Sequence, residues 1–64
     1  MNWLRKLWYR RLRRLDMELL WPSCRQLAPS LDIAKAAFAV HAMNDPAWMF
    51  LGEDEVWRII DGLQ

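Results

Sequence analysis

Three prolines, at positions 22, 29 and 46, constrain the fold of this chain more than any other feature. Each proline lacks a backbone N–H and pushes the residue before it out of the helical region. The segments between the prolines carry apolar residues at helical spacing, and none alternates polar and apolar residues convincingly enough for a strand. We therefore expect an all-α protein whose helices begin or end near the prolines.

Three helices are expected, over about residues 2–20, 31–43 and 53–63. The Trp21-Pro22 pair should end the first helix, and Ser30 has the residue type that caps the second. The second helix is almost wholly apolar, so we expect it to lie at the centre of the fold and to be buried on most sides.

Two shorter helical turns are expected between these helices. Ser23–Gln26 has the spacing of a capping box, and Asp45-Pro46 supplies a cap and a first helical residue for a turn over residues 47–51. Connections this short predict a single domain over residues 1–64, folded as a compact three-helix bundle with a short extra helical turn.

The size of the chain leaves little surface to bury. A chain of 64 residues buries only about 60% of the surface that its unfolded form exposes. Cys24 is the only cysteine, so no disulfide can form within one chain, and a lone thiol favours a reducing compartment. The apolar content of 55% therefore either fills a dense core or awaits a partner or a second copy, and we expect both.

No catalytic site, metal site or cofactor is predicted. His41 is the only histidine and lies among alanine and valine, and Cys24 has no predictable base beside it. Zinc needs three or four ligands, which one cysteine and one histidine do not supply. No glycine-rich loop could hold a phosphate. We therefore expect a protein that is not an enzyme.

The small net charge of +1 hides a strong asymmetry between the two halves. Residues 1–28 carry seven basic and two acidic groups (+5), and residues 29–64 carry two basic and six acidic groups (−4). The halves could attract each other inside the fold or between copies. Alternatively, the basic half could offer a face to an acidic partner.

The first helix has two faces when its residues are placed about 100° apart. One apolar stripe is predicted to be core, and it consists of Leu4, Trp8, Leu12, Leu15 and Leu19. Basic residues lie nearly opposite, with two apolar residues at their margin. Because Trp and Arg are enriched among interface hot spots, we predict a partner-binding surface. Its residues are Trp3, Leu7, Arg10, Arg11, Arg13 and Arg14.

The charges of the first helix also oppose its dipole. Arg5 and Lys6 lie near the positive N-terminal end, and Asp16 and Glu18 lie near the expected C-terminal end. Local rules are broken in this way most often at functional sites, which supports the predicted surface. Neutralisation of the cluster by acidic residues of the third helix is the structural alternative.

Three kinds of partner fit a basic helix with exposed tryptophan. A larger protein with an acidic surface is preferred, because arginine forks and tryptophan anchors suit it. Nucleic acid is less favoured because the C-terminal half would repel phosphate. An anionic membrane surface is less favoured because the apolar stripe is needed for the core.

The stretch Ala37-Phe38-Ala39-Val40-His41-Ala42, followed by Asp45-Pro46-Ala47-Trp48, resembles short reading frames of bacteriophages and prophages. The resemblance implies a small phage accessory protein, of the kind that binds and inhibits a host enzyme or a defence complex, anti-CRISPR proteins among them. The arginine-rich helix lies outside this stretch. It also departs from the acidic nucleic-acid mimics that are frequent among anti-CRISPR proteins.

Overall fold

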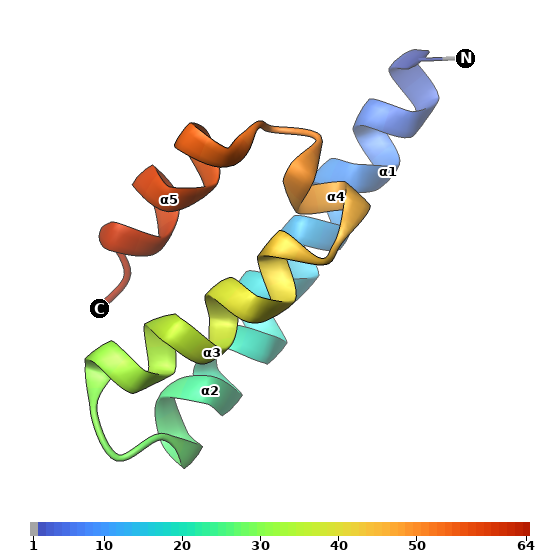
Figure 1. Ribbon diagram of the computed structural model, residues 1–64. Helices are drawn as coiled ribbons and strands as arrows, with labels where there is room; N and C mark the ends of the chain where they lie inside the picture. The colour runs from blue at the N-terminus through green and yellow to red at the C-terminus, as the bar shows by residue number, and fades with distance from the viewer. Residues whose placement is uncertain (1) are drawn as a thin grey trace.

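The computed structural model describes residues 2–64, which form helices and turns and no strand (Figure 1). This confirms the predicted all-α fold, a small helical bundle. A second helix runs back along the long N-terminal helix. A short helix follows, and the last helix packs against the second one. The elements are α1 (Asn2–Leu15), the π-helical turn η1 (Asp16–Leu20), α2 (Trp21–Leu27), α3 (Leu31–Met43), α4 (Pro46–Met49) and α5 (Glu53–Asp61).

The first helix does not end at Leu20, so that prediction was wrong. Trp21 keeps helical φ and ψ angles of −59° and −47°, and its N–H bonds to the carbonyl of Asp16 five residues earlier. Because of this wide turn, Pro22 becomes the second residue of α2. A proline inside a regular α-helix lacks one N–H bond and crowds the preceding turn, and the wider π-helical turn before Pro22 accommodates both without ending the helix.

The wide turn also sets which residues face the neighbouring helix. Residues five apart lie on the same side of a π-helix, whereas in an α-helix they would point about 140° apart. Asp16 and Trp21 therefore both face α3, where they meet His41 and Phe38 respectively. The long helix stays continuous, and two of its successive turns face α3.

Local signals set the bounds of α3 as predicted. Ala28 is extended before Pro29, and the Ser30 hydroxyl accepts a hydrogen bond from the N–H of Ile33 at 3.2 Å. α3 then packs against α2, α4 and α5. Its central place is confirmed, but Ile33 and Val40 are 51% and 66% exposed, so one of its sides remains open.

The C-terminal half completes the core. Asp45 caps α4 by accepting from the N–H of Ala47 at 2.8 Å, and Pro46 is the first helical residue, as predicted. Gly52 then takes a φ of 90°, which favours glycine, and leads into α5. α5 ends at Asp61 and not at Leu63, because the glycine at position 62 is a poor helix former, yet Leu63 is buried.

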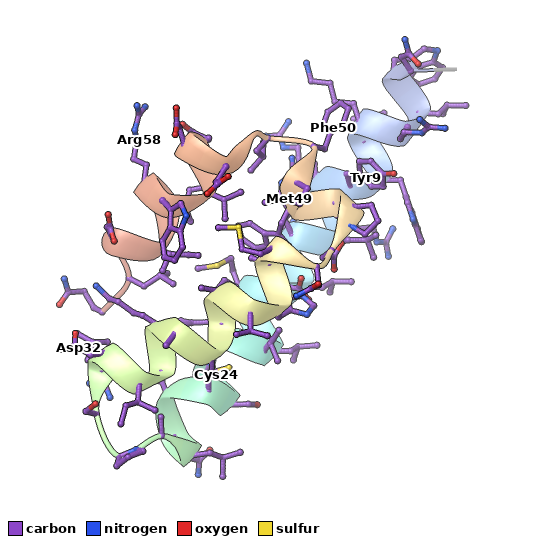
Figure 2. All side chains as sticks on the ribbon, in the orientation of Figure 1. Tyr9, Cys24, Asp32, Met49, Phe50 and Arg58 are labelled. Carbon is purple, nitrogen blue, oxygen red and sulfur yellow. The ribbon has the colours of Figure 1, made fainter. Side chains whose placement is uncertain are left out.

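Three aromatic rings form the centre of the core. Phe38 is fully buried, and the rings of Trp21 and Trp48 meet it edge to face at centroid distances of 5.7 and 5.4 Å. Such contacts add to the free energy gained from burying the rings. Outside the core, Tyr9 meets Phe50 edge-on at 5.4 Å, and both side chains are labelled in Figure 2. The core therefore joins α2, α3 and α4.

Replacing the central ring should unfold the protein. Phe38→Ala is expected to lower the free energy of unfolding by about 3–5 kcal/mol, because it leaves a cavity between two tryptophans. A chain of this size has little more stability than that to lose. Chemical denaturation followed by circular dichroism at low protein concentration measures the change. Val40→Ala, on the exposed side of the same helix, should change little, and equal losses would contradict this account of the core.

Candidate functional site

Four of the five residues in the apolar stripe of the first helix lie in solvent, so their assignment to the core was wrong, while the fifth, Leu12, is half-buried. Leu4, Trp8, Leu15 and Leu19 are 40% to 68% exposed, and α1 has no buried residue. α3 packs on α2. Among the elements of the C-terminal half in the described chain, α4 is the one that packs against α1, and it is only four residues long. α4 covers the neighbouring side of α1, where Tyr9 is half-buried, and leaves these four side chains open.

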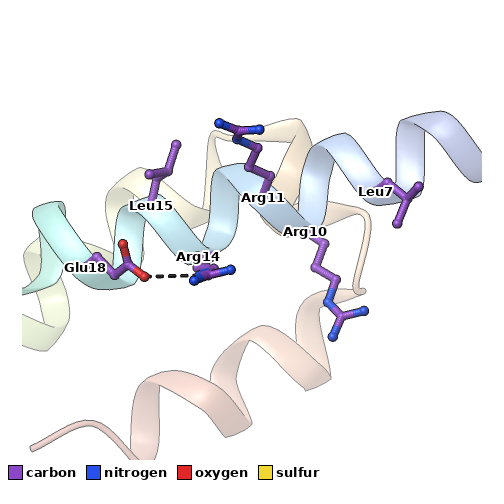
Figure 3. Close-up of a pocket in the computed structure, with 6 residues that line it drawn as sticks. All are labelled: Leu7, Arg10, Arg11, Arg14, Leu15 and Glu18. Carbon is purple, nitrogen blue, oxygen red and sulfur yellow. Dashed lines mark hydrogen bonds and ion pairs between the residues drawn. The ribbon is translucent and has the colours of Figure 1, made fainter.

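A groove on α1 gathers most of the predicted partner-binding surface (Figure 3). It has a volume of about 620 Å³ and combines basic and apolar side chains along the helix. Trp3 lies one turn before Leu7 and is 60% exposed, so it extends this surface toward the N-terminus. The residues that line the groove are Leu7, Arg10, Arg11, Arg14, Leu15 and Glu18.

The charges of the groove are not neutralised by the other half of the chain. Arg14 pairs with Glu18 at 3.1 Å within the same helix, and both side chains are largely exposed. Among residues 2–64, Arg10 and Arg11 form no ion pair. Within the described residues, the acidic start of α5 pairs only with its own Arg58, so the predicted alternative of neutralisation by this helix is not seen there.

Arg13, one of the predicted binding residues, is half-buried and so differs from its exposed neighbours Arg10, Arg11 and Arg14. Its Nη1 donates a 2.6 Å hydrogen bond to the carbonyl oxygen of Ala47, which joins α1 to α4. Partial burial, with a contribution from the like charge of Arg10, lowers the pKa of Arg13 below its ordinary value. The guanidinium is thus a structural donor.

The charges of the long helix oppose its dipole less than the sequence suggested. Because the helix continues to Leu27, Asp16 and Glu18 lie in its middle and not at its negative end. Their positions are explained by partners, which are His41 for Asp16 and Arg14 for Glu18. Only the basic residues near the N-terminus still oppose the dipole.

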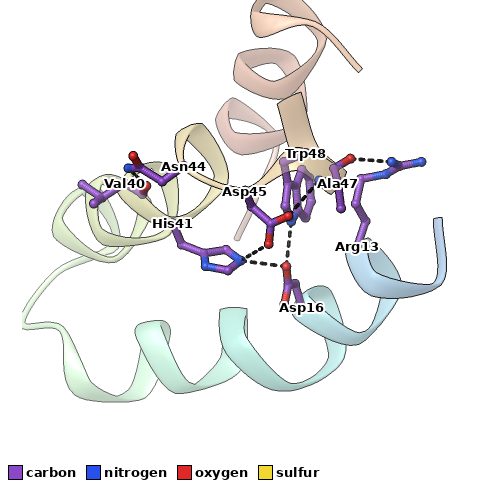
Figure 4. Close-up of polar contacts among 8 residues, drawn as sticks. All are labelled: Arg13, Asp16, Val40, His41, Asn44, Asp45, Ala47 and Trp48. Atoms are coloured by element: carbon purple, nitrogen blue, oxygen red, sulfur yellow. Dashed lines mark hydrogen bonds and ion pairs between the residues drawn. The ribbon is translucent and has the colours of Figure 1, made fainter. Parts of the chain in front are cut away.

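A half-buried polar cluster joins η1, α3 and α4 (Figure 4). Asp16 Oδ2 accepts from Trp48 Nε1 at 2.7 Å and lies 2.8 Å from His41 Nε2. His41 Nε2 also lies 3.4 Å from Asp45 Oδ2, while Asp45 Oδ1 caps α4. Within the described part of the chain, no buried side-chain nitrogen or oxygen is left without a partner. The cluster thereby satisfies the polar edge of the aromatic core.

Three side chains of this cluster, Asp16, His41 and Asp45, have donor atoms that could hold a divalent cation. Ligand atoms of Asp16, His41 and Asp45 lie within 4.8 Å of one another, and one nitrogen with two carboxylate oxygens suits several transition metals. Counting only cysteine and histidine in the sequence missed this grouping. Asp16 accepts a hydrogen bond from Trp48 and Asp45 accepts one from Ala47, and these bonds already account for the positions of the two carboxylates.

The comparisons with known proteins reveal no relationship. The chain matches no protein family, no curated protein and no solved structure. In residues 2–64, no helix is both long enough and apolar enough to cross a membrane.

Because Arg13 joins α1 to α4, its replacement should destabilise the fold more than replacement of an exposed neighbouring arginine. Arg13→Ala is expected to lower the free energy of unfolding by about 1–2 kcal/mol, because it removes a charge-assisted hydrogen bond to Ala47. Arg10→Ala, which removes an exposed guanidinium from the same helix, should change it by less than about 0.5 kcal/mol. Urea denaturation of the two variants makes the comparison, and equal stability would return Arg13 to the exposed surface.

The polar cluster can be tested through its shared acceptor. Asp16→Ala leaves Trp48 Nε1 without its protein acceptor and leaves His41 Nε2 only its more distant partner, Asp45 Oδ2. The free energy of unfolding should therefore fall by about 1–3 kcal/mol. Near-ultraviolet circular dichroism should report a changed environment of tryptophan. Glu18→Ala, which removes an exposed carboxylate two residues away, is the matched control and should leave both readouts near those of the wild type. Unchanged readouts for Asp16→Ala would show that the cluster stabilises nothing.

Proposed function

We propose that the protein is a small non-catalytic binding module that docks on a larger protein through the groove of α1. The observation that carries this proposal is the exposed groove in which arginine and leucine side chains lie together. Monomeric proteins rarely leave large apolar side chains grouped in solvent, and such groups mark interaction sites. Arginine beside exposed tryptophan is typical of binding hot spots.

The groove fits an acidic partner segment that also carries apolar side chains. Arg10 and Arg11 can each give two parallel hydrogen bonds to a carboxylate, and neither is engaged by the described part of the chain. Leu7 and Leu15 supply apolar walls, and Trp3 is a rigid anchor at one end. An amphipathic helix with acidic residues is the simplest partner of this chemistry.

Two other partners use some of the same residues. Phosphates of nucleic acid would bind the arginines, but Glu18 in the groove and the acidic half of the chain oppose a polyanion. An anionic membrane would accept Leu4 and Trp8, and their exposure removes the reason against it that the sequence suggested. The test below therefore distinguishes all three partners.

For the biological setting we propose a phage-type inhibitor or adaptor acting in the cytoplasm of a host cell. The support is the resemblance of residues 37–42 and 45–48 to short phage reading frames. Phe38, Ala42 and Trp48 in these stretches are buried, so the resemblance concerns the scaffold and not the groove. A scaffold with a basic docking helix suits an inhibitor that occupies an acidic site on its target.

Charge reversal in the groove should abolish partner binding. Wild-type protein and the Arg10→Glu/Arg14→Glu variant are immobilised, and proteins of a native host extract that they retain are identified by mass spectrometry. The variant should lose the specific partner, because its carboxylates repel an acidic surface. Circular dichroism should stay helical, because neither side chain is buried.

The matched control is Arg25→Glu/Arg58→Glu. It makes the same change in net charge, and it also breaks one ion pair within a helix, here that of Arg58 with Glu55. The control should keep the partner, and retention by the groove variant would contradict the proposal. A mobility shift with duplex DNA that weakens steeply with salt would assign the groove to nucleic acid, and flotation with anionic vesicles would assign it to lipid.

A further inference from the structure

A second exposed surface runs beside the groove and continues beyond it onto α3. On the long helix it carries the stripe that was expected to be core, and Leu27 extends it at 85% exposure. On α3 it carries Ile33 and Val40. An apolar groove of about 400 Å³ joins the two helices, and Leu20, Ser23, Cys24, Leu27, Ile33 and Ala37 are among the residues that line it. We call this surface the apolar face; its exposed members are Leu4, Trp8, Leu15, Leu19, Leu27, Ile33 and Val40.

No part of the described chain covers the apolar face. Lys35, about 200° around α3 from Ile33, reaches the carbonyl oxygen of Asp61 at 2.8 Å. α5 therefore packs against the other side of α3. In Figure 2, Cys24 lies between α2 and α3, at a distance from α5. So many large apolar side chains in solvent are unusual for a chain with so small a core.

The lack of charge along the apolar face indicates what covers it. None of its members is charged, so the face can meet an identical face across a two-fold axis without repulsion. The neighbouring groove could not do this, because Arg10 and Arg11 would face the same arginines. We propose that the apolar face binds a second copy of this chain and forms a two-fold symmetric dimer.

The charges at the two ends of the face favour an antiparallel arrangement. Arg5 and Arg11 flank the stripe on either side near the N-terminus, and Asp32 lies next to Ile33 at the far end. If the two long helices are antiparallel, these arginines approach Asp32 of the second copy. Leu4 of one copy then lies near the Leu27 end of the apolar face of the other. Parallel helices would bring like charges together. The charge asymmetry of the chain, which is not neutralised within one copy, is thus partly satisfied between two.

The size of the face suits a dimer of modest affinity. From the lengths of the long helix and α3 and the usual spacing of packed helices, it offers roughly 600 Å² per copy. Specific interfaces bury about 600–1,000 Å² per partner, so this face lies at the lower end of that range. We expect a dissociation constant in the micromolar range. Leu15 belongs to both the groove and the apolar face, but Leu7, Arg10 and Arg14 lie beside the face, so different variants test the dimer and the proposed function.

Sedimentation equilibrium over a wide concentration range tests the dimer with Val40→Glu. Val40 lies near the middle of the face, beside His41, and is 66% exposed in one copy. Glutamate has a higher helix propensity than valine, so the variant should fold at least as well. Its dissociation constant should rise at least about a hundredfold, because two uncompensated carboxylates enter the interface. Leu19→Glu, on the long helix, should act in the same way.

Trp57→Glu is the matched control, because Trp57 is a large exposed side chain on α5, outside the apolar face. It should dimerise like the wild type, and so should the Arg10→Glu/Arg14→Glu variant. A wild-type protein that stays monomeric at every concentration would overturn the proposal. So would a Val40→Glu variant that associates normally, or a monomer that binds vesicles containing phosphatidylglycerol through this face.

Discussion

A single wide turn in the backbone determines how the rest of the molecule is arranged. The i→i+5 hydrogen bond from Trp21 to Asp16 lets the long helix pass Pro22 without ending, and it rotates the following turn back toward α3. As a result, one neighbour receives both a carboxylate and an indole from the same helix. The aromatic centre and the polar cluster beside it both depend on this rotation. π-helical turns are rare and recur at functional sites, and here the turn has a structural role.

The parts of the fold that were predicted correctly depend on neighbouring residues. Ser30 and Asp45 cap their helices through hydrogen bonds to backbone two or three residues away, so their effect is visible in the sequence. Pro22 was misjudged because its tolerance depends on contacts with residues far along the chain. Trp48 and His41 hold Asp16 in place, and no local pattern indicates that they meet there.

The candidate site shows the same division. Helical spacing alone placed Leu7, Arg10, Arg11 and Arg14 on one exposed groove, because all four lie in regular α-helix. The hydrogen bond of Arg13 could not be predicted, because only the tertiary structure brings the carbonyl of Ala47 within its reach. The stripe was misassigned because periodicity identifies an apolar face but not what covers it. A second copy or a partner satisfies the same pattern as a core.

The absence of buried residues in α1 has a thermodynamic consequence for recognition. Its first two turns are held only by their own backbone hydrogen bonds and by continuity with the turns that follow. Short helical segments without tertiary packing open at little cost in free energy, and their amide protons exchange quickly. Any ligand of these turns must therefore also select the helical state of the segment. Part of the interaction energy is consumed in ordering, which lowers affinity and allows one sequence to fit differently shaped surfaces.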